Sequence, residues 1–170
     1  NTTEDTARVN TYILLCKAYW EEINDREKYK QQAFKILTLS QKLNYKKGIA
    51  YGYLYTGNYY LAIAEYSKAL SNYDKATQLF ESIGLKKGLS SCYLNIGLVN
   101  ANLGNYAKSI AFTEKAAKVT IESGDKRTEA HAYNNIGINY FQLGNYVEAL
   151  KYYHKSLHLR EVIKDELGIA

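Results

Sequence analysis

The sequence predicts an all-α protein in which about four helix pairs stack as a solenoid, and three observations lead to this fold class. Whole segments recur every 40 residues without a gap. Within each segment the apolar residues follow one another at three- and four-residue spacing, which places them on one face of an α-helix. The 170 residues include no Pro, so long helices can form with few breaks, and 11 Gly must supply most of the turns.

The repeat is clearest in three consecutive units, predicted at 48–87, 88–127 and 128–167. The stretch that starts at Tyr93 (YLNIGLVNANLGNY) matches the stretch that starts at Tyr133 (YNNIGINYFQLGNY) at Tyr, Asn, Ile, Gly and the Leu-Gly-Asn-Tyr run. A fixed period of this length indicates stacked supersecondary units. The positions that keep the 40-residue spacing in all three units are Tyr53, Tyr93 and Tyr133; Gly57, Gly97 and Gly137; Tyr66, Tyr106 and Tyr146; and Lys75, Lys115 and Lys155.

Each unit is predicted to contain two helices. The first helix is expected at about 47–63, 88–103 and 128–143, and the second at about 66–83, 106–123 and 146–163. Gly104 and Gly144 are expected to end first helices in a left-handed conformation, and Asn105 and Asn145 to cap the helices that follow. Gly84, Gly124 and Asn44 occupy the second turn, while Ala64-Glu65 replaces Gly-Asn and predicts a less well capped junction.

Both ends of the array depart from the pattern. A degenerate first unit is predicted at 8–47, where Trp20 stands in place of Tyr60 and Tyr140, and Asn24-Asp25 replaces the Gly-Asn turn. Atypical end units are expected because an end repeat faces water on one side. Residues 168–170, the Gly-Ile-Ala after Leu167, match the start of a further, truncated unit.

Composition and charge limit the classes of function. With 46% apolar and 23% charged residues, the chain is typical of a folded protein. The net charge of +5 concerns solubility more than partners. No apolar run approaches the roughly 18 residues that span a membrane, so no direct membrane insertion is expected. Cys16 and Cys92 lie too far apart for a redox pair, and they are predicted to be buried free thiols.

Small and aromatic residues at fixed places give the unit a resemblance to the tetratricopeptide repeat. The resemblance implies a right-handed α-α superhelix in which small residues let two antiparallel helices approach and aromatic residues fill the space between units. The standard repeat has 34 residues, and the longer unit is similar to those of kinesin light chains and bacterial regulators. The matching residues are Gly97 and Gly137; Tyr60 and Tyr140; Ala69, Ser109 and Ala149; and Ala76, Ala116 and Ser156.

The sequence of the last unit, from Tyr133 to the end of the chain, is most similar to repeat regions that precede sensor histidine kinases, transcription regulators or cyclases in Bacteroidetes-like bacteria. That resemblance implies either an exported sensor region or a cytoplasmic regulator, so a periplasmic and a cytoplasmic location both stay open. It is specific for the fold and weak for the function, because the same scaffold serves many partners.

A peptide-binding groove is expected on the inner surface, which the first helix of each unit lines. Side-chain amides can bond both the N–H and the C=O of an extended peptide, and tyrosine rings add contact area. Asn95 and Asn135, at equivalent places, are where related repeats commonly hold a peptide backbone. With Tyr53, Gly57 and Tyr60 facing the core, the groove residues are predicted to include Tyr51, Tyr55, Asn58, Ser91, Asn95, Asn102, His131, Asn134, Asn135 and Gln142.

A chaperone-tail adaptor, which clamps a terminal carboxylate, is not expected. The two amide positions of that family variant fall on Asn58 and Asn95, which match. Its basic positions fall on Leu54, His131 and Asn135, which leave little to neutralise a carboxylate.

No catalytic, metal or nucleic-acid site is expected. His154 and His158 share a helical face, but their counterparts in other units are ordinary solvent positions, so no metal or other cofactor is expected. No nucleophile stands beside His131 in a catalytic pattern, which predicts a protein that is not an enzyme. The basic pairs Lys46-Lys47, Lys86-Lys87 and Lys126-Arg127 are interpreted as complements of the preceding helix dipole rather than as a nucleic-acid surface.

Two functions therefore compete. The leading one is a non-catalytic protein–protein interaction module that binds a peptide segment of a partner in the concave groove. The alternative is a sensory or assembly region of a larger signalling protein, in which the array changes its curvature or forms an end-to-end homo-oligomer.

Overall fold

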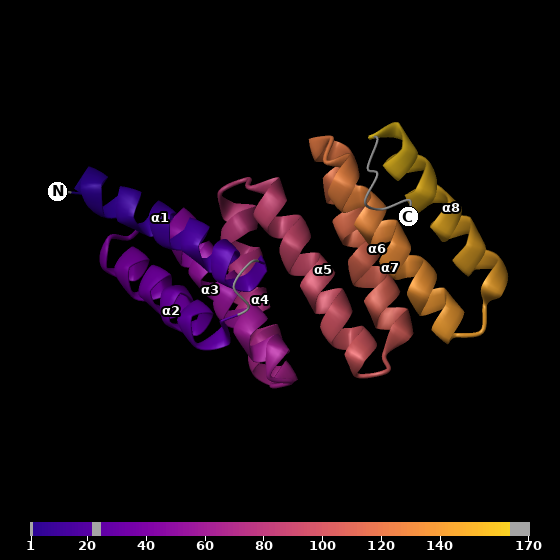
Figure 1. Cartoon of the computed structure of the whole chain (residues 1–170), viewed down its shortest axis with the longest axis horizontal. Helices are drawn as coiled ribbons and strands as arrows, with labels where there is room; N and C mark the ends of the chain where they lie inside the picture. Colours follow the sequence, from indigo (N-terminus) through magenta and orange to yellow (C-terminus); the bar gives the residue numbers. More distant parts are fainter. Residues whose placement is uncertain (1, 22–24, 164–170) are drawn as a thin grey trace. The chain divides into compact units, whose positions relative to one another are not determined.

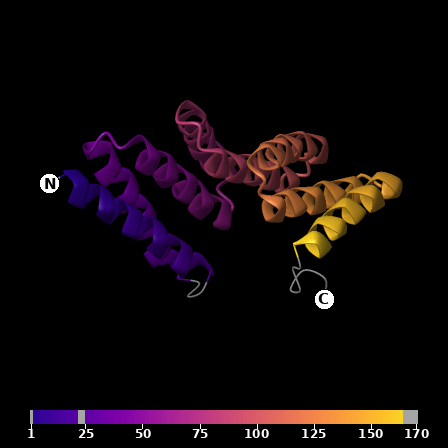
Figure 2. The same ribbon diagram turned by 90° about the horizontal axis from the view of Figure 1, so that it is seen from above.

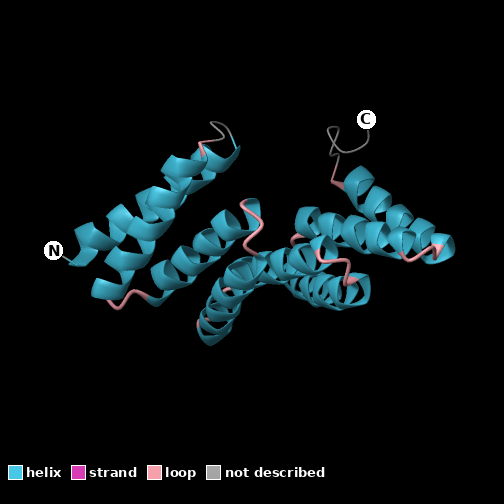
Figure 3. Ribbon diagram, turned by 90° about the horizontal axis from the view of Figure 1, so that it is seen from below, coloured by secondary structure: helices cyan, strands magenta, loops and turns pink. Residues whose placement is uncertain are grey.

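The computed structural model describes residues 2–21 and 25–163, and these form eight α-helices and no strand (Figures 1 and 3). This confirms the all-α prediction. Asn24 and residues 168–170, part of the predicted first turn and the predicted truncated unit, lie outside the described residues. The helices are α1 (Thr2–Glu21), α2 (Arg26–Lys42), α3 (Lys46–Ala62), α4 (Tyr66–Ser82), α5 (Lys86–Asn102), α6 (Tyr106–Ser123), α7 (Lys126–Gln142) and α8 (Tyr146–Val162).

The chain forms two compact units, Asn1–Gly88 and Leu89–Ala170. In the first unit α2 packs against α1 and α3, and α3 against α4; in the second, α7 packs against α6 and α8 (Figure 2). Consecutive helices thus pair within each unit, as expected for helical repeats.

The predicted period is visible in the helix starts. Helices α3, α5 and α7 begin at Lys46, Lys86 and Lys126, and α4, α6 and α8 begin at Tyr66, Tyr106 and Tyr146. The starts are 40 residues apart, and the predicted helix ranges agree with the observed ones to within two residues. Where each repeat begins and ends stays a prediction.

Glycine lets the two helices of a pair approach closely, as the small-residue pattern predicts. A Cβ added to Gly57 would lie 2.6 Å from the Tyr73 ring, and one added to Gly137 would lie 2.7 Å from the Tyr153 ring. Real Cβ atoms do not come this close to a ring carbon, so a larger residue would push α3 from α4, or α7 from α8.

The turns also follow the prediction, with one difference. Gly104 and Gly144 have φ of +75° and +74°, and Ala64, which replaces Gly in the equivalent turn, is forced to +58°. Asn145 accepts a hydrogen bond from the Glu148 N–H at 3.3 Å and caps α8. Asn105 makes no such bond, so its predicted cap is wrong. The backbone N–H of Ser109 instead bonds the Asn105 carbonyl oxygen at 2.9 Å, as the helix itself requires.

The interior is built from alanines, a few large side chains and the two cysteines. Tyr29, Tyr73 and Phe80 are buried in the first unit, together with Cys16. Both Cys16 and Cys92 are buried free thiols, as predicted. Burial raises the pKa of the Cys16 thiol to about 12, because the apolar surroundings disfavour the thiolate.

The basic pairs were interpreted as complements of the C-terminal end of the preceding helix, but each pair is part of the helix that follows. Lys46, Lys86 and Lys126 are the first residues of α3, α5 and α7, and the second member of each pair follows in the same first turn. Positive charge at a helix N-terminus is unfavourable to that helix. The proposed benefit to the preceding helix therefore does not explain why the pairs recur. No described helix is long and apolar enough to cross a bilayer.

Candidate functional site

In the second unit, one side of α7 presents the predicted groove residues. His131, Asn134, Asn135 and Gln142 lie on one face of α7, because their spacings of three, one and seven residues keep them within about a third of the helix circumference. His131 and Gln142 are exposed, and Asn134 and Asn135 are half-buried. Ser91 and Asn95 are half-buried and Asn102 is exposed on α5, which holds the equivalent residues of the preceding repeat.

A small pocket of about 90 Å³ opens on this face between α5 and α7. Leu98 and Ile138 line it, and they are 46% and 42% exposed. Ala101 and Asn135 complete the part of the wall that α5 and α7 supply. The volume exceeds the roughly 30 Å³ that one water occupies in the liquid and is below the ~150 Å³ of a cavity that holds benzene. The pocket therefore has room for one small aliphatic side chain.

Three buried polar residues form the floor of this small pocket. Asn139 donates through Nδ2 to the Ser109 hydroxyl at 2.9 Å and to the Asn135 carbonyl oxygen at 2.8 Å. Thr113 donates to the Ser109 carbonyl oxygen at 2.8 Å. Because the bond between Asn139 and Ser109 ties α7 to α6, the fold itself holds this floor in place.

The amides on the rim of the pocket differ in how they are engaged. Among the described residues, the side chains of Asn134 and Asn135 form no hydrogen bond, so all their donors and acceptors face water or a ligand. Asn95 does interact within the chain. The face therefore presents two uncommitted amides on α7 and, on α5, an Asn95 that already interacts within the chain.

In the first unit, the predicted groove residues are more deeply packed than expected. Tyr55 is only 6% exposed, so the prediction that it lies on an open surface is wrong. Its ring lies 6.1 Å from the Tyr29 ring and 5.8 Å from the Tyr51 ring, centroid to centroid. Asn58 accepts a hydrogen bond from the Tyr73 hydroxyl at 3.0 Å and thereby supports the core. Of the three predictions in this unit, only Tyr51 and Asn58 keep partial exposure.

The sequence prediction missed the apolar part of the site. Leu98 and Ile138 lie one 40-residue period apart, and they follow Gly97 and Gly137 directly. Their exposure could have been inferred from this register, because the residue after the glycine turns about 100° away from the helix pair contact. Neither residue is among the predicted groove residues.

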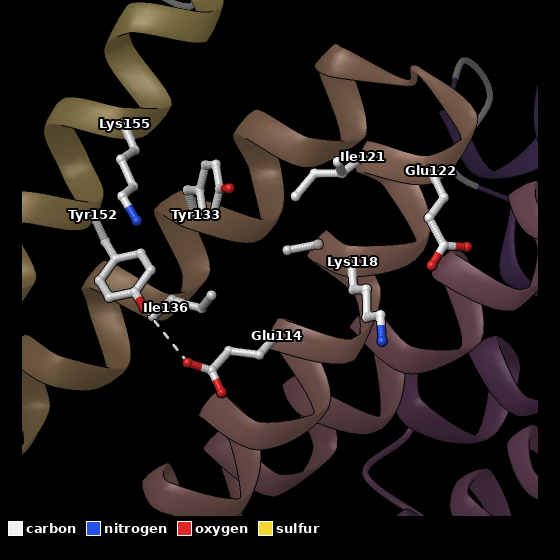
Figure 4. Close-up of a pocket in the computed structure, with 9 residues that line it drawn as sticks. Glu114, Lys118, Ile121, Glu122, Tyr133, Ile136, Tyr152 and Lys155 are labelled. Carbon is white, nitrogen blue, oxygen red and sulfur yellow. Dashed lines mark hydrogen bonds between the residues drawn. The ribbon is translucent and has the colours of Figure 1, made fainter.

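A second and larger pocket, of about 460 Å³, lies among α6, α7 and α8 (Figure 4). On α7 its lining residues are Tyr133 and Ile136, which lie on the opposite side of the helix from Asn134, Asn135 and Ile138. Figure 4 shows the Tyr152 hydroxyl directed at Glu114, to which it donates a hydrogen bond at 3.4 Å. This pocket therefore combines apolar side chains, such as Ile121 and Ile136, with charged side chains at its rim, such as Lys118 and Glu122.

Lysine and tyrosine are paired at the edge of the larger pocket. Lys155 Nζ lies 5.3 Å from the centroid of the Tyr133 ring and 4.8 Å from that of Tyr152, within cation–π range. Burial, and then Glu114, raise the pKa of Tyr152; burial, and then Glu129, raise the pKa of Tyr133. Both rings therefore keep their hydroxyl protons at neutral pH and donate hydrogen bonds rather than act as bases.

Lysine–tyrosine pairs recur with the period of the repeat. Lys75 Nζ lies 5.4 Å from the Tyr53 ring centroid, and Lys115 Nζ lies 5.8 Å from that of Tyr93. Since the pair is present in every regular unit, it belongs to the architecture of the repeat rather than to one site.

The two histidines considered for a metal, His154 and His158, are exposed on α8. Among the described residues, no cluster of three or more His, Cys, Asp or Glu side chains is close enough to hold a metal ion.

Comparison with known proteins identifies the repeat. The tetratricopeptide repeat family matches residues 89–161, which cover the second compact unit almost entirely. A comparison of the sequence with curated proteins gives no significant match. The resemblance to regulators of Bacteroidetes-like bacteria stays an expectation.

Solved structures share the fold over nearly the whole chain. Aspartyl phosphate phosphatase F from Bacillus subtilis is 18% identical with a TM-score of 0.85, over 94% of this chain and 42% of its own. A Rap protein complexed with Competence and Sporulation Factor is 16% identical with a TM-score of 0.84, over 94% and 45%. A signal transduction ATPase with a tetratricopeptide repeat sensor from Pyrococcus horikoshii is 23% identical with a TM-score of 0.78, over 97% and 26%.

The chain therefore spans less than half the length of each of these three proteins, and identities this low establish the fold alone. Together, the match of residues 89–161 to the tetratricopeptide repeat, the 40-residue helix period and the shared fold show that the chain is a helical-repeat protein.

Proposed function

We propose that this protein is a non-catalytic interaction module, and that the α5–α7 face of its second unit binds an extended peptide segment of a partner protein. Tetratricopeptide repeats are typical of non-catalytic scaffold domains, and the Rap protein of the same fold is complexed with another factor. The observation that supports the proposal most directly is the small pocket between Leu98 and Ile138, bordered by the unengaged amide of Asn135.

In this proposal, amides hold the peptide backbone and the pocket selects one side chain. Asn95 on α5 and Asn135 and Asn134 on α7 donate to backbone carbonyl oxygens and accept from backbone N–H groups of the peptide, which needs no particular sequence. The small pocket between Leu98 and Ile138 then supplies the specificity, since it has room for a side chain such as Val or Thr and excludes an aromatic ring. The fixed floor keeps the cost of ordering the site low.

Selection from a displayed random-peptide library tests the proposal. The wild-type chain should enrich peptides that share a small aliphatic residue at one position. The Asn95→Ala/Asn135→Ala double variant should bind these peptides about tenfold to hundredfold more weakly, because two hydrogen bonds of about 0.5–1.5 kcal/mol each are lost. Enriched peptides that bind both proteins equally would contradict the proposal.

Two further variants make the result specific. Asn105→Ala removes an asparagine that makes no capping bond and lies in the turn after α5, so it should bind as the wild type does. Ala101→Leu places a larger side chain in the wall of the small pocket and should abolish the preference for the aliphatic residue. Circular dichroism of each variant shows whether the fold is kept.

A second proposal is that the array is a sensory segment of a larger signalling protein. It is supported by the shared fold with a protein whose tetratricopeptide repeats are described as a sensor. It predicts that groove variants leave partner binding unchanged, which is the opposite of the expectation for the peptide site.

A further inference from the structure

The floor of the small pocket between α5 and α7 contains a hydrogen-bond acceptor that the chain leaves unused. Asn139 lines this pocket and is only 3% exposed. Its Nδ2 donates to the Ser109 hydroxyl and to the Asn135 carbonyl oxygen, and because a carbonyl can only accept, these bonds fix which end of the amide is the nitrogen. Among the described residues, the buried Oδ1 atom of Asn139 has no hydrogen-bond partner. A buried acceptor of this kind destabilises the folded chain unless something donates to it.

The Ser109 hydroxyl supplies a donor beside this acceptor. It accepts the bond from Asn139, and its own proton has no acceptor among the described side chains and carbonyl groups. A hydroxyl group can donate one hydrogen bond and accept others. A single hydroxyl brought to the floor of the pocket can therefore donate to the Asn139 amide oxygen and accept from Ser109.

The other repeats show that packing does not require these two polar residues. One period before Asn139 the equivalent residue is Val99, which is buried. The equivalents of Ser109 are Ala69 and Ala149, and both are buried as well. Apolar side chains thus satisfy both positions elsewhere in the array, so the polar floor is a property of this one pocket.

The space above the floor is also particular to this part of the array. Thr113 lines the pocket and occupies the position of Tyr73 and Tyr153 in the other units. A Cβ added to Gly57 or Gly137 would meet the rings of those tyrosines, which shows that the rings fill the space beside the paired helix. A threonine fills less of that space than a ring does, so it helps to leave a pocket where the other units are packed.

We propose that the peptide side chain that enters this pocket is a threonine. Its hydroxyl donates to the Asn139 Oδ1 atom and accepts from the Ser109 hydroxyl, while its methyl group contacts the apolar walls formed by Leu98 and Ile138. This inference rests on the proposed peptide site and names the residue that the site selects. Valine has the same shape but leaves the acceptor unpaired, and serine has the hydroxyl but lacks the methyl group.

Peptides that differ at one position test this proposal. A peptide enriched by the wild-type chain is synthesised with Thr, Val or Ser at the shared position, and isothermal titration calorimetry gives each Kd. The Thr peptide should bind about tenfold more tightly than the Val peptide, because it gains hydrogen bonds at equal shape. It should bind about fourfold more tightly than the Ser peptide, which buries one methyl group less.

Variants taken from the other repeats show whether the polar floor causes the preference. Asn139→Val introduces the residue found at Val99 and should reduce the ratio of the Val and Thr Kd values to about twofold or less. Ser109→Ala introduces the residue found at Ala69 and should lower the same ratio, because one of the two bonds is lost. Asn135→Ala is the control, since it should weaken both peptides by the same factor and keep the ratio. Circular dichroism shows whether each variant is folded, and Ser109→Ala replaces Asn139→Val if the latter is not.

The outcomes separate this inference from the proposed function. Equal Kd values for the Thr and Val peptides would overturn the inference and leave the peptide site standing. A tenfold preference that neither Asn139→Val nor Ser109→Ala reduces would also overturn it, because the hydroxyl would then bind elsewhere. A chain that enriches no peptide at all would contradict the proposed function, and the inference would fail with it.

Discussion

Cys16 illustrates how burial sets the chemistry of a single residue. Its Sγ lies 3.8 Å from the Tyr29 carbonyl oxygen, to which the thiol donates a weak hydrogen bond. Surroundings that disfavour the thiolate raise the pKa of this group from its ordinary 9.0 to about 12. The thiolate is the reactive species, so the folded protein should protect Cys16 from alkylation.

At pH 8, alkylation of Cys16 in the folded protein should therefore be about a thousandfold slower than in the unfolded chain, following the thiolate fraction. Peptide mass spectrometry after timed iodoacetamide treatment measures this rate, and fast labelling of the native protein would contradict the buried position.

The same pKa shift has a consequence for stability. The contribution of Cys16 is complete below about pH 9, where the thiol is protonated in both states, and is lost as pH rises towards 12.

At the scale of the element, the turn between α3 and α4 is strained where its counterparts are not. Ala64 has a φ of +58°, in a turn where the equivalent Gly104 and Gly144 adopt the left-handed conformation freely. A residue with a Cβ destabilises the fold by roughly 1–2 kcal/mol in this left-handed conformation. Glycine avoids that strain, but its greater freedom in the unfolded chain offsets part of the gain.

Ala64→Gly should accordingly stabilise the protein by about 0.5–1 kcal/mol and raise its Tm by about 2 °C. Differential scanning calorimetry checks the shift. Gly104→Ala, in the equivalent turn, is the matched control and should lower the Tm by a similar or larger amount. If Ala64→Gly lowers the Tm, the strain at this turn is not the dominant effect.

Many features of the helices and turns could be predicted from the sequence, because they depend on local rules. Gly57 and Gly137 predict the close approach of paired helices, and the glycine turns predict where α6 and α8 begin. What could not be predicted depends on three-dimensional neighbours. Tyr55 is buried by rings from other helices, and Asn58 bonds Tyr73, although both occupy groove positions by register.

Only part of the candidate site could be predicted, because the rest also depends on three-dimensional neighbours. Periodicity locates Asn134 and Asn135 on one helix face, but it does not show which amides remain unengaged. Nor does it show that Leu98 and Ile138 leave a pocket between two helices, since that depends on how far α5 and α7 stand apart. Small side chains at Ala101 and Ser109 help to keep this space open.

At the scale of the whole molecule, the two sides of α7 offer a partner two different surfaces. One side has the small pocket beside Asn135, and the other has the larger pocket with Tyr133 and the rim charges (Figure 4). A peptide backbone needs uncommitted amides, which only the first side provides on α7. Peptide binding should therefore be confined to the side that holds Leu98 and Ile138.

Photo-crosslinking of a library-selected peptide to the full chain, with the adducts located by mass spectrometry, tests this claim most directly. A photoreactive residue placed beside the selected aliphatic position should label Leu98, Asn135 or Ile138, and the Asn95→Ala/Asn135→Ala variant should lose the adducts. Adducts confined to Ile121, Tyr133 or Tyr152 would show that the partner uses the opposite side of α7, and would contradict the account.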